Sequence, residues 1–467
     1  MSGETPFWQA LQSKGDAVAV IHPESQCVLT YRELHLRVQR AADELRKYAR
    51  SLVLFFVNND VGGVVCYLAA LDAGHAVFLS PSGTDQPGVQ SLIQMYRPEL
   101  ILWRRAAVPA SLEHHYESGG LADEYWVLRR RHQVDEPPHP ALAAVLSTSA
   151  STGSPKAVRL SAASLSASAV QVADALAVTH TDRSLLSLPL SYVYGLSVLN
   201  STLYVGGALV ILKKSLADRA VYTQLASSGV TGMACVAQTF EYMRRLKIDA
   251  ALLPTLRRLT HSGSSLDPQL FAWIYDHFGR CGTDIYLMYG QTEACGRISV
   301  LPPEALPELH RSVGRTMRSG ALSISDGGEV VYRGPGVMLG YATCREDLNL
   351  GDTLQGVLHT GDLGHMDDRG YLFLTGRLSR HCKVFGQRVN LDDIEVFVGC
   401  ERQTAAVEKS GHIAIFFEGV APAASPSLMQ LARHFQLPPQ SFRLYAVPEL
   451  PRTNRGKIAY TTLLSML

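Results

Sequence analysis

Apolar positions in the first part of the chain follow two alternating spacings. A helix opens at Leu29–Leu34, and after it apolar residues recur at the spacing of one helix face. Leu52–Val57 is instead an unbroken apolar run, typical of a strand buried on both faces. A helix over Val61–Ala73, ended by Gly74, and a strand over Ala76–Leu79 follow. This alternation predicts a parallel sheet covered on both sides. The periodic helical positions are Leu34, Val38, Ala41, Ala42 and Leu45.

The same alternation continues through the middle of the chain. Ser184–Leu212 carries no charged residue, so a membrane span has to be weighed. Pro189, Asn200 and Gly206–Gly207 interrupt it, and a buried strand–helix–strand unit is the preferred interpretation. Other predicted elements are helices over Ala162–Leu176, Ala217–Ser227 and Pro268–Phe278, and strands over Ala208–Leu212, Gly232–Val236 and Ile285–Met288.

Short strands and glycine turns replace this pattern from Ser312 onward and predict a β-rich subdomain. A boundary is expected near Gly376–Arg380, because Cys382–Leu467 has the pattern of a small α+β unit of its own. The predicted fold class is therefore α/β, with a large N-terminal domain over residues 1–377. A small α+β C-terminal domain over residues 380–467 completes the chain.

Charge and cysteine content narrow the possible partners. The 43 Lys and Arg residues against 42 Asp and Glu give a formal charge of +1. A formal charge this close to zero gives the chain no overall electrostatic attraction for nucleic acid or an anionic membrane. A phosphate ligand therefore has to be bound by particular side chains and backbone groups. The eight cysteines include no C-x-x-C pair, which favours reduced thiols in the cytoplasm over a zinc ribbon or a disulfide framework. Met1–Trp8 lacks the basic start and apolar stretch of a signal peptide.

Hydroxyl side chains are concentrated in the loop Thr148–Lys156, between two predicted strands. Backbone N–H groups, hydroxyls and the Lys156 ammonium can converge there on phosphate oxygens, with Pro155 stiffening the approach to the lysine. Lys156 stands three residues after Gly153, so the loop is not a Walker A motif. A solvated hairpin turn has the same composition, and the loop alone leaves both interpretations open.

Five segments stand in one order along the chain: residues 148–156, Tyr289–Glu293, Thr360–Asp362, Gly376–Arg377 with Lys383–Val389, and Pro451–Ile458. Together they resemble the adenylate-forming superfamily of acyl- and aryl-CoA synthetases, nonribosomal peptide synthetase adenylation domains and luciferase-like enzymes. Any one segment is weak by itself. The resemblance covers the chain from about residue 25 to the C-terminus.

The resemblance implies a reaction and its cofactors. Members join a carboxylate to the α-phosphate of ATP, expel pyrophosphate, and pass the acyl group from acyl-AMP to the thiol of CoA or phosphopantetheine, with Mg²⁺ as cofactor. Attack of one anion on another requires cations and aligned donors. The family assigns Lys457 to bridge the substrate carboxylate and the α-phosphate as a point charge. Without the other motifs, Asn454–Lys457 would be a basic surface turn.

The resemblance also implies the nucleotide contacts. Tyr289 would lie against adenine, Thr292 would touch the α-phosphate, and Glu293 would hold Mg²⁺. Asp362 would accept the ribose hydroxyls and Arg377 would add a ribose or phosphate contact. The structural alternatives are a helix-start carboxylate for Glu293, a turn residue for Asp362 and a core residue for Tyr289. The other implied nucleotide-binding positions are Ser149, Ser151, Thr152, Gly153, Lys156, Gly263 and Gly290.

Several positions depart from the family. Ala150 and Ala157 stand where glycines are usual; if position 150 needs a positive φ, alanine costs about 1 kcal/mol or more and slows turnover. Ser379 occupies the hinge position about which the mobile small domain would swing between adenylation and thioester poses. Tyr192 replaces a frequent histidine and Ala237 a frequent proline.

The acid pocket is expected along Leu188–Asn200, with Tyr192, Tyr194 and Gly195. Adenylating relatives specific for amino acids place an aspartate there, whereas this segment has no charge. Since a buried unpaired ammonium is costly, an uncharged fatty or aryl carboxylic acid is favoured as the small-molecule partner. CoA and a separate acyl carrier protein both stay open as acceptors. Two alternatives also remain: an amino-acid-adenylating enzyme, and a nucleotide-binding homologue with impaired catalysis that acts through a partner.

Overall fold

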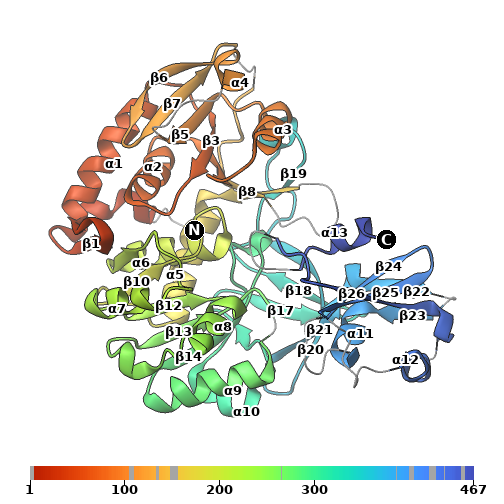
Figure 1. Cartoon of the computed structure of the whole chain (residues 1–467). Helices are drawn as coiled ribbons and strands as arrows, with labels where there is room; N and C mark the ends of the chain where they lie inside the picture. Colours follow the sequence, from red (N-terminus) through yellow and green to blue (C-terminus); the bar gives the residue numbers. More distant parts are fainter. Residues whose placement is uncertain are drawn as a thin grey trace. The chain divides into compact units, whose positions relative to one another are not determined.

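A computed structural model describes residues 5–104, 110–132, 136–147, 156–264, 266–384, 387–398, 404–419, 427–435, 437–453 and 458–467 (Figure 1). The chain divides into two compact units. The first comprises Met1–Thr148, Lys156–Ala321 and Tyr332–Leu358, and the second comprises Ser149–Pro155, Leu322–Val331 and His359–Leu467. The domain boundary at residues 377–380 stays a prediction.

One large sheet of the first unit has eight strands. Its order is β19 (Gly340–Ala342), β9 (Ala157–Ser161), β8 (Leu142–Ser147), β4 (Ala76–Pro81), β3 (Leu52–Val57), β5 (Leu100–Arg104), β7 (Tyr125–Arg130) and β6 (Tyr116–Ala122). At its centre β3 pairs in parallel with β4 and β5, and β4 with β8. All six residues of β3 are buried, as the apolar run predicted.

Helices α1 (Tyr31–Leu45) and α2 (Val61–Asp72) pack side by side in this part of the unit, which also contains α3 (Gln86–Tyr96) and the short helix α4 (Ala110–Glu113) (Figure 1). A capping box begins α1: the Thr30 hydroxyl accepts from the Glu33 N–H, and the Glu33 carboxylate accepts from the Thr30 N–H at 2.8 Å. The Asp60 carboxylate caps α2 by accepting from the Gly63 N–H at 2.8 Å. Every periodic apolar position predicted for α1 is buried.

The other large sheet of the first unit has nine strands. Its order is β16 (Arg315–Thr316), β15 (Ser299–Leu301), β14 (Asp284–Tyr289), β13 (Arg258–His261), β12 (Gly232–Cys235), β10 (Arg183–Leu186), β11 (Ala208–Ile211), β1 (Val18–His22) and β2 (Cys27–Thr30). The accompanying helices are α5 (Ala162–Ala175), α6 (Val193–Val205), α7 (Arg219–Ser227), α8 (Ala237–Arg245), α9 (Pro268–His277) and α10 (Leu306–Leu309).

The uncharged stretch Ser184–Leu212 folds as the sequence predicted. It contributes the parallel neighbours β10 and β11, which α6 connects. Among the residues that the structure describes, no helix has the length and apolar character needed to span a membrane.

Antiparallel pairs flank the parallel centres of both sheets. They include β1 with β2, β6 with β7, β8 with β9, and β14 with β15. A short connection reverses the chain, whereas a parallel neighbour requires a longer crossover. The parallel arrangement is therefore confirmed at the centres, and the antiparallel edges add to it.

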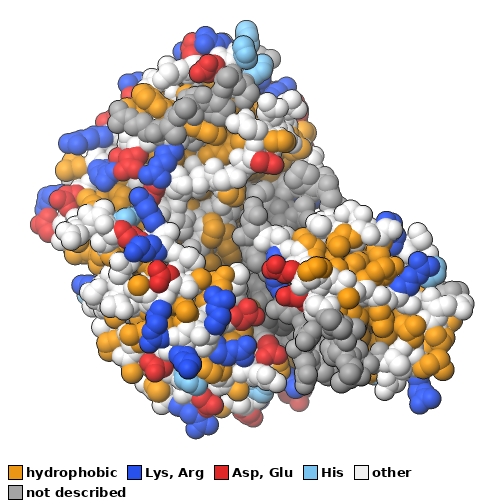
Figure 2. All heavy atoms as spheres, viewed as in Figure 1, with side chains coloured by type: hydrophobic (Ala, Val, Ile, Leu, Met, Phe, Trp, Pro, Cys, Tyr) orange, Lys and Arg blue, Asp and Glu red, His pale blue; other side chains and the backbone are white. Residues whose placement is uncertain are grey.

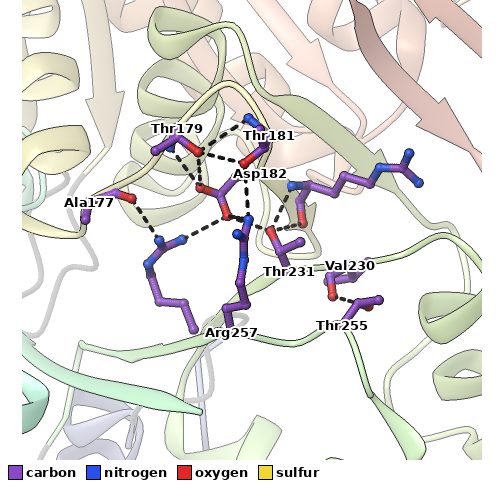
Figure 3. Close-up of polar contacts among 10 residues, drawn as sticks. Ala177, Thr179, Thr181, Asp182, Val230, Thr231, Thr255 and Arg257 are labelled. Atoms are coloured by element: carbon purple, nitrogen blue, oxygen red, sulfur yellow. Dashed lines mark hydrogen bonds and ion pairs between the residues drawn. The ribbon is translucent and has the colours of Figure 1, made fainter. Parts of the chain in front are cut away.

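A buried carboxylate joins three strands of the nine-stranded sheet. Asp182 accepts from the Thr179 N–H at 2.8 Å, from the Thr231 hydroxyl at 2.7 Å and from Arg257 at 2.9 Å (Figure 3). Burial acts to raise the pKa of Asp182, but these donors and Arg258 hold that pKa below its usual value. Asp182, Thr231 and Arg257 immediately precede β10, β12 and β13, so the carboxylate ties the starts of these strands together.

The second unit contains most of a four-stranded sheet and the whole C-terminal region. The sheet runs β17 (Ala321–Ile324), β18 (Glu329–Arg333), β20 (Val357–Met366) and β21 (Leu372–Arg377). A small core that includes Ile394, Ile415 and Leu431 lies among the C-terminal elements. These elements are β22 (His381–Val384), β23 (Gln387–Asn390), α11 (Leu391–Val398), β24 (Thr404–Lys409), β25 (His412–Glu418), α12 (Leu428–Phe435), β26 (Phe442–Val447) and α13 (Tyr460–Ser465).

Charges of both signs are mixed over the first unit on the face shown in Figure 2. Exposed ion pairs in this unit include Arg32 with Asp16 and Arg280 with Asp276. The mixture agrees with the formal charge of +1, and any anionic ligand must be recognised by particular side chains.

Candidate active site

The candidate site in the first unit begins where β14 ends. Tyr289, the last residue of β14, is 7% exposed and pairs with Ser299 of β15. At the next position, a Cβ on Gly290 would lie 2.1 Å from the carbonyl oxygen of Gly296. Only glycine therefore fits at position 290, because the chain returns past its own backbone there.

A tight turn holds Thr292 and Glu293. Both residues lie half-buried in the 3-10 helix η6 (Thr292–Ala294). The Gly296 N–H donates to the Gln291 carbonyl at 2.9 Å, and Cys295 takes a left-handed φ of 51°. These features fix the backbone that carries the predicted phosphate and metal contacts.

Tyr341 brings two of the predicted site residues together. Its hydroxyl donates to Glu293 Oε1 at 2.9 Å, and Lys156 Nζ lies 5.4 Å from the centroid of its ring. The pairing of β19 with β9 places Tyr341 opposite Val158, close to the lysine that precedes β9. Burial and the neighbouring Glu293 carboxylate raise the pKa of the Tyr341 phenol, so the phenol stays a donor.

The structure describes the two strands on either side of the loop predicted to bind phosphate. Strands β8 and β9 are antiparallel, with Ser147 opposite Ala157, so the predicted strand–loop–strand arrangement is confirmed at both ends of the loop. Some predicted site residues lie outside the described residues, namely Ser149, Ala150, Ser151, Thr152, Gly153 and the proposed catalytic Lys457.

Two predicted pocket residues come from the start of α6. Tyr192 is its N-cap, and the ring centroids of Tyr192 and Tyr194 lie 6.2 Å apart, edge to face. The Tyr194 hydroxyl donates to the Thr260 carbonyl at 2.9 Å, which ties α6 to β13. Gly263 follows β13 with a φ of +102°, and a Cβ there would lie 2.9 Å from the Tyr192 hydroxyl. Three predicted residues therefore meet between α6 and β13.

Close packing against the preceding loop requires a glycine at position 195. A Cβ at this position would lie 2.4 Å from the Pro189 carbonyl oxygen and 2.5 Å from that of Leu188. The loop before α6 thus rests directly on the helix backbone. Its place in the acid pocket stays a prediction.

Arg297 is a buried charged residue beside Tyr194 that the sequence interpretation missed. It is 2% exposed, and its Cζ lies 3.7 Å from the centroid of the Tyr194 ring. The acid pocket was expected along Leu188–Asn200, whereas Arg297 follows the Tyr289–Glu293 motif. Its position directly after that motif was the available signal.

In the second unit, Asp362 and Arg377 lie opposite each other on β20 and β21. Arg377 Nε donates to Asp362 Oδ1 at 2.9 Å, and Asp362 is 5% exposed. The Thr360 hydroxyl accepts from the Asp362 N–H at 3.1 Å and donates to the Val330 carbonyl at 2.7 Å. The structure therefore joins these two predicted residues; their contact with a ribose stays a prediction.

The expected hinge residue Ser379 lies in the 3-10 helix η9 (Leu378–Arg380). Arg380 forms ion pairs with Asp392, at 2.7 Å, and with Glu395. The Arg380 guanidinium also lies 4.1 Å from the centroid of the Tyr460 ring. The chain is thus anchored to the C-terminal elements directly after Ser379, and the hinge itself stays a prediction.

Comparison with known proteins agrees with this geometry. Residues 7–342 match the family model of AMP-binding enzymes. A 2-succinylbenzoate–CoA ligase of Staphylococcus epidermidis is 25% identical over 97% of this chain and 96% of that protein. An indoleacetate–CoA ligase of Aromatoleum aromaticum is 29% identical over 67% of this chain and 64% of that protein.

Solved structures show the same fold. The o-succinylbenzoate CoA synthetase of Bacillus subtilis, in complex with its acyl-adenylate intermediate, has a TM-score of 0.80 at 22% identity, covering 99% of this chain and 98% of that one. ATP-bound MatB of Rhodopseudomonas palustris has a TM-score of 0.78 at 21% identity, with 99% and 98% covered. The chain therefore belongs to the AMP-binding enzymes of the adenylate-forming superfamily, and it is an acid–thiol ligase.

Proposed function

We propose that the acid is an aryl carboxylic acid that binds beside Tyr192 and Tyr194. Two relatives, named for 2-succinylbenzoate and indoleacetate, act on aryl acids. Two neighbouring tyrosine rings suit such an acid, because aromatic rings favour edge-to-face and offset contacts. The buried Arg297 beside Tyr194 opposes an amino acid as substrate, since its positive charge would repel an α-ammonium.

The observation that carries the proposal is the contact of both Glu293 and Lys156 with Tyr341. Acyl-adenylate formation brings a carboxylate against the α-phosphate, so the site has to supply positive charge and fixed donors. In the proposal, Lys156 and the loop before it orient the β- and γ-phosphates, Thr292 contacts the α-phosphate, and Lys457 bridges the reacting groups.

The nucleotide contacts are proposed residue by residue. Tyr289 is proposed to lie against adenine and Asp362 to accept the ribose hydroxyls, with Arg377 alongside. The Asp362 carboxylate suits this role, because neighbouring strands hold it and each of its oxygens has two lone pairs. Gly263 and Gly290 are proposed to let the backbone approach the nucleotide.

Glu293 fits the Mg²⁺ that the family uses. The Tyr341 hydroxyl donates to Oε1 of this carboxylate. Mg²⁺ is usually held by one or two carboxylates together with phosphate oxygens and water. Among the described residues, no group of three or more His, Cys, Asp or Glu side chains is placed to hold a metal ion. When bound, Mg²⁺ would neutralise phosphate charge, and Glu293 would hold it beside the turn.

The acceptor and location complete the proposal. We propose free CoA as the thiol, with a carrier-protein phosphopantetheine arm as the alternative that the test must separate. A hinge at Ser379 would let the C-terminal region exchange adenylation and thioester poses. The seven described cysteines are free, which suits the cytoplasm, where ATP and CoA are available.

Hydroxamate-trapped adenylation across a library of aryl, fatty and amino acids tests the proposal, with Lys457→Ala as the blank. An aryl acid should give ATP-dependent hydroxamate that the blank lacks. Mass spectrometry then compares thioester formation on CoA and on a carrier protein. Turnover restricted to amino acids would refute the aryl assignment, and ATP binding without any acyl-adenylate would favour a catalytically impaired homologue.

A further inference from the structure

We propose that the Arg297 guanidinium recognises a second anionic group on the acid, so that the enzyme activates one carboxylate of a dicarboxylic acid. The inference rests on the proposed function, because it concerns the acid pocket of the same reaction. It deepens that function by assigning charge to the part of the acid that does not react.

Two contacts place Arg297 within the proposed acid pocket. Its Cζ lies 3.7 Å from the centroid of the Tyr194 ring, which in turn neighbours the Tyr192 ring. The backbone of Arg297 belongs to the turn that follows Glu293, where the Arg297 backbone N–H donates to the Ala294 carbonyl at 3.3 Å. One short stretch of backbone therefore carries the residues proposed for the phosphates and this guanidinium.

The guanidinium has little to balance its charge. Arg297 is 2% exposed, and it forms no ion pair with any described carboxylate. Nη1 donates to the carbonyl oxygen of Gly296 at 2.8 Å, whereas Nε is buried and makes no hydrogen bond to a described residue. Tyr194 offers only its ring face, because its hydroxyl is directed to Thr260. A buried cation is costly unless an anion and hydrogen bonds compensate it.

Two other buried arginines show how this chain compensates the charge of a structural guanidinium, although Nε and Nη1 of Arg345 lack a hydrogen bond to a described residue. Arg159 is 0% exposed and donates from Nε, Nη1 and Nη2 to backbone carbonyls between residues 339 and 351. Arg345 is 2% exposed and forms an ion pair with Glu99 at 2.5 Å. Within the described part of the chain, Arg297 has neither arrangement, so a purely structural role leaves its charge unexplained.

A carboxylate is the anion that suits this guanidinium. The planar fork of N–H donors matches the two oxygens of a carboxylate, and the pair is strong when water is excluded. An aryl group packed against Tyr192 and Tyr194 would bring an attached carboxylate to Arg297. The uncharged segment Leu188–Asn200 had favoured an uncharged acid, but Arg297 lies outside that segment and adds a positive charge to the pocket.

Adenylation kinetics with matched acids test the inference: benzoate against phthalate, phenylacetate against 2-carboxyphenylacetate, and 4-oxo-4-phenylbutanoate against 2-succinylbenzoate. For the wild type, kcat/KM should favour the dicarboxylate in at least one pair by about a hundredfold. Arg297→Met should abolish that preference through a higher KM for the dicarboxylate, which should bring kcat/KM for the dicarboxylate close to that for the monocarboxylate. Arg297→Lys, which keeps the charge, should retain part of the preference.

The controls separate the possible failures. Arg280→Met removes an arginine whose side chain is 69% exposed, and no kinetic change is expected. Equal use of both acids in every pair, with a ratio that Arg297→Met leaves unchanged, overturns the inference and leaves the proposed function standing. Absence of hydroxamate with every acid refutes the proposed function and the inference with it. If circular dichroism shows Arg297→Met to be unfolded, the wild-type ratio and Arg297→Lys decide.

Discussion

The Tyr341 hydroxyl donates a 2.9 Å hydrogen bond to Glu293 Oε1, although Tyr341 lies in the eight-stranded sheet and Glu293 in the turn after β14 of the nine-stranded sheet. The Met338 N–H also donates to the Glu293 carbonyl at 2.9 Å, so the segment before β19 and the turn after β14 are joined twice. Lys156 lies near the same tyrosine ring. Tyr341 is therefore placed to orient the carboxylate proposed to hold Mg²⁺.

Tyr341→Phe should lower kcat/KM for MgATP by about tenfold, because a hydrogen bond to a charged group is lost while the ring beside Lys156 stays. Pyrophosphate exchange at varied MgATP measures the effect. Tyr275→Phe is the matched control; the Tyr275 ring packs against Phe271 and Arg280, and phenylalanine preserves both contacts. An unchanged kcat/KM in Tyr341→Phe would remove Tyr341 from the site.

Glu293→Gln tests the metal contact directly. Glutamine can still accept the hydrogen bond from Tyr341 but carries no charge for a hard cation. The Mg²⁺ concentration for half-maximal adenylation should rise about tenfold or more. A Mg²⁺ titration at fixed ATP checks this, with the exposed Glu304→Gln as the control. The same Mg²⁺ dependence in Glu293→Gln and the wild type would contradict the assignment.

The sequence predicted the elements whose pattern is local. The periodic apolar positions of α1 and its Thr30–Glu33 capping box lie within one segment, as does the apolar run of β3. Both predictions were confirmed, because burial of one helix face leaves apolar residues at helical spacing and burial of both strand faces leaves a continuous apolar run. The hairpin of β6 and β7 lacked such a trace and was missed.

Contacts between distant segments could not be predicted in the same way. The motifs identified both Asp362 and Arg377, but their ion pair depends on the register of β20 and β21. Arg297 was missed for a related reason: its contact with Tyr194 joins residues about a hundred positions apart, and no local pattern records that packing. Motifs thus indicated which residues matter, and tertiary packing determined what they touch.

Gly290→Ala should disrupt the site through the backbone. The added Cβ would lie 2.1 Å from the Gly296 carbonyl oxygen and 2.7 Å from Arg297 Cα, so the turn has to shift. We expect a destabilisation of about 1–3 kcal/mol and loss of adenylation. Urea unfolding and hydroxamate formation measure the two effects. Gly83→Ala, where no atom lies within 4 Å of the new Cβ, should change neither. Full activity in Gly290→Ala would mean that the turn tolerates displacement.

Asp182→Asn should destabilise the first unit, because Asp182 joins the starts of three strands while its side chain is only 1% exposed. The loss should be about 2 kcal/mol, less than for a fully buried ion pair, since the Arg257 side chain is 54% exposed. The pKa of Asp182 is lowered in the folded protein, so its charge stabilises the fold at neutral pH. This contribution should be lost as the pH falls below about 4, the ordinary pKa of an aspartate, towards the lowered one. Urea midpoints of wild type and variant should therefore differ at pH 7 and converge in acid, whereas the exposed Asp276→Asn should match the wild type at both. A difference that does not depend on pH would show that Asp182 acts through packing rather than charge.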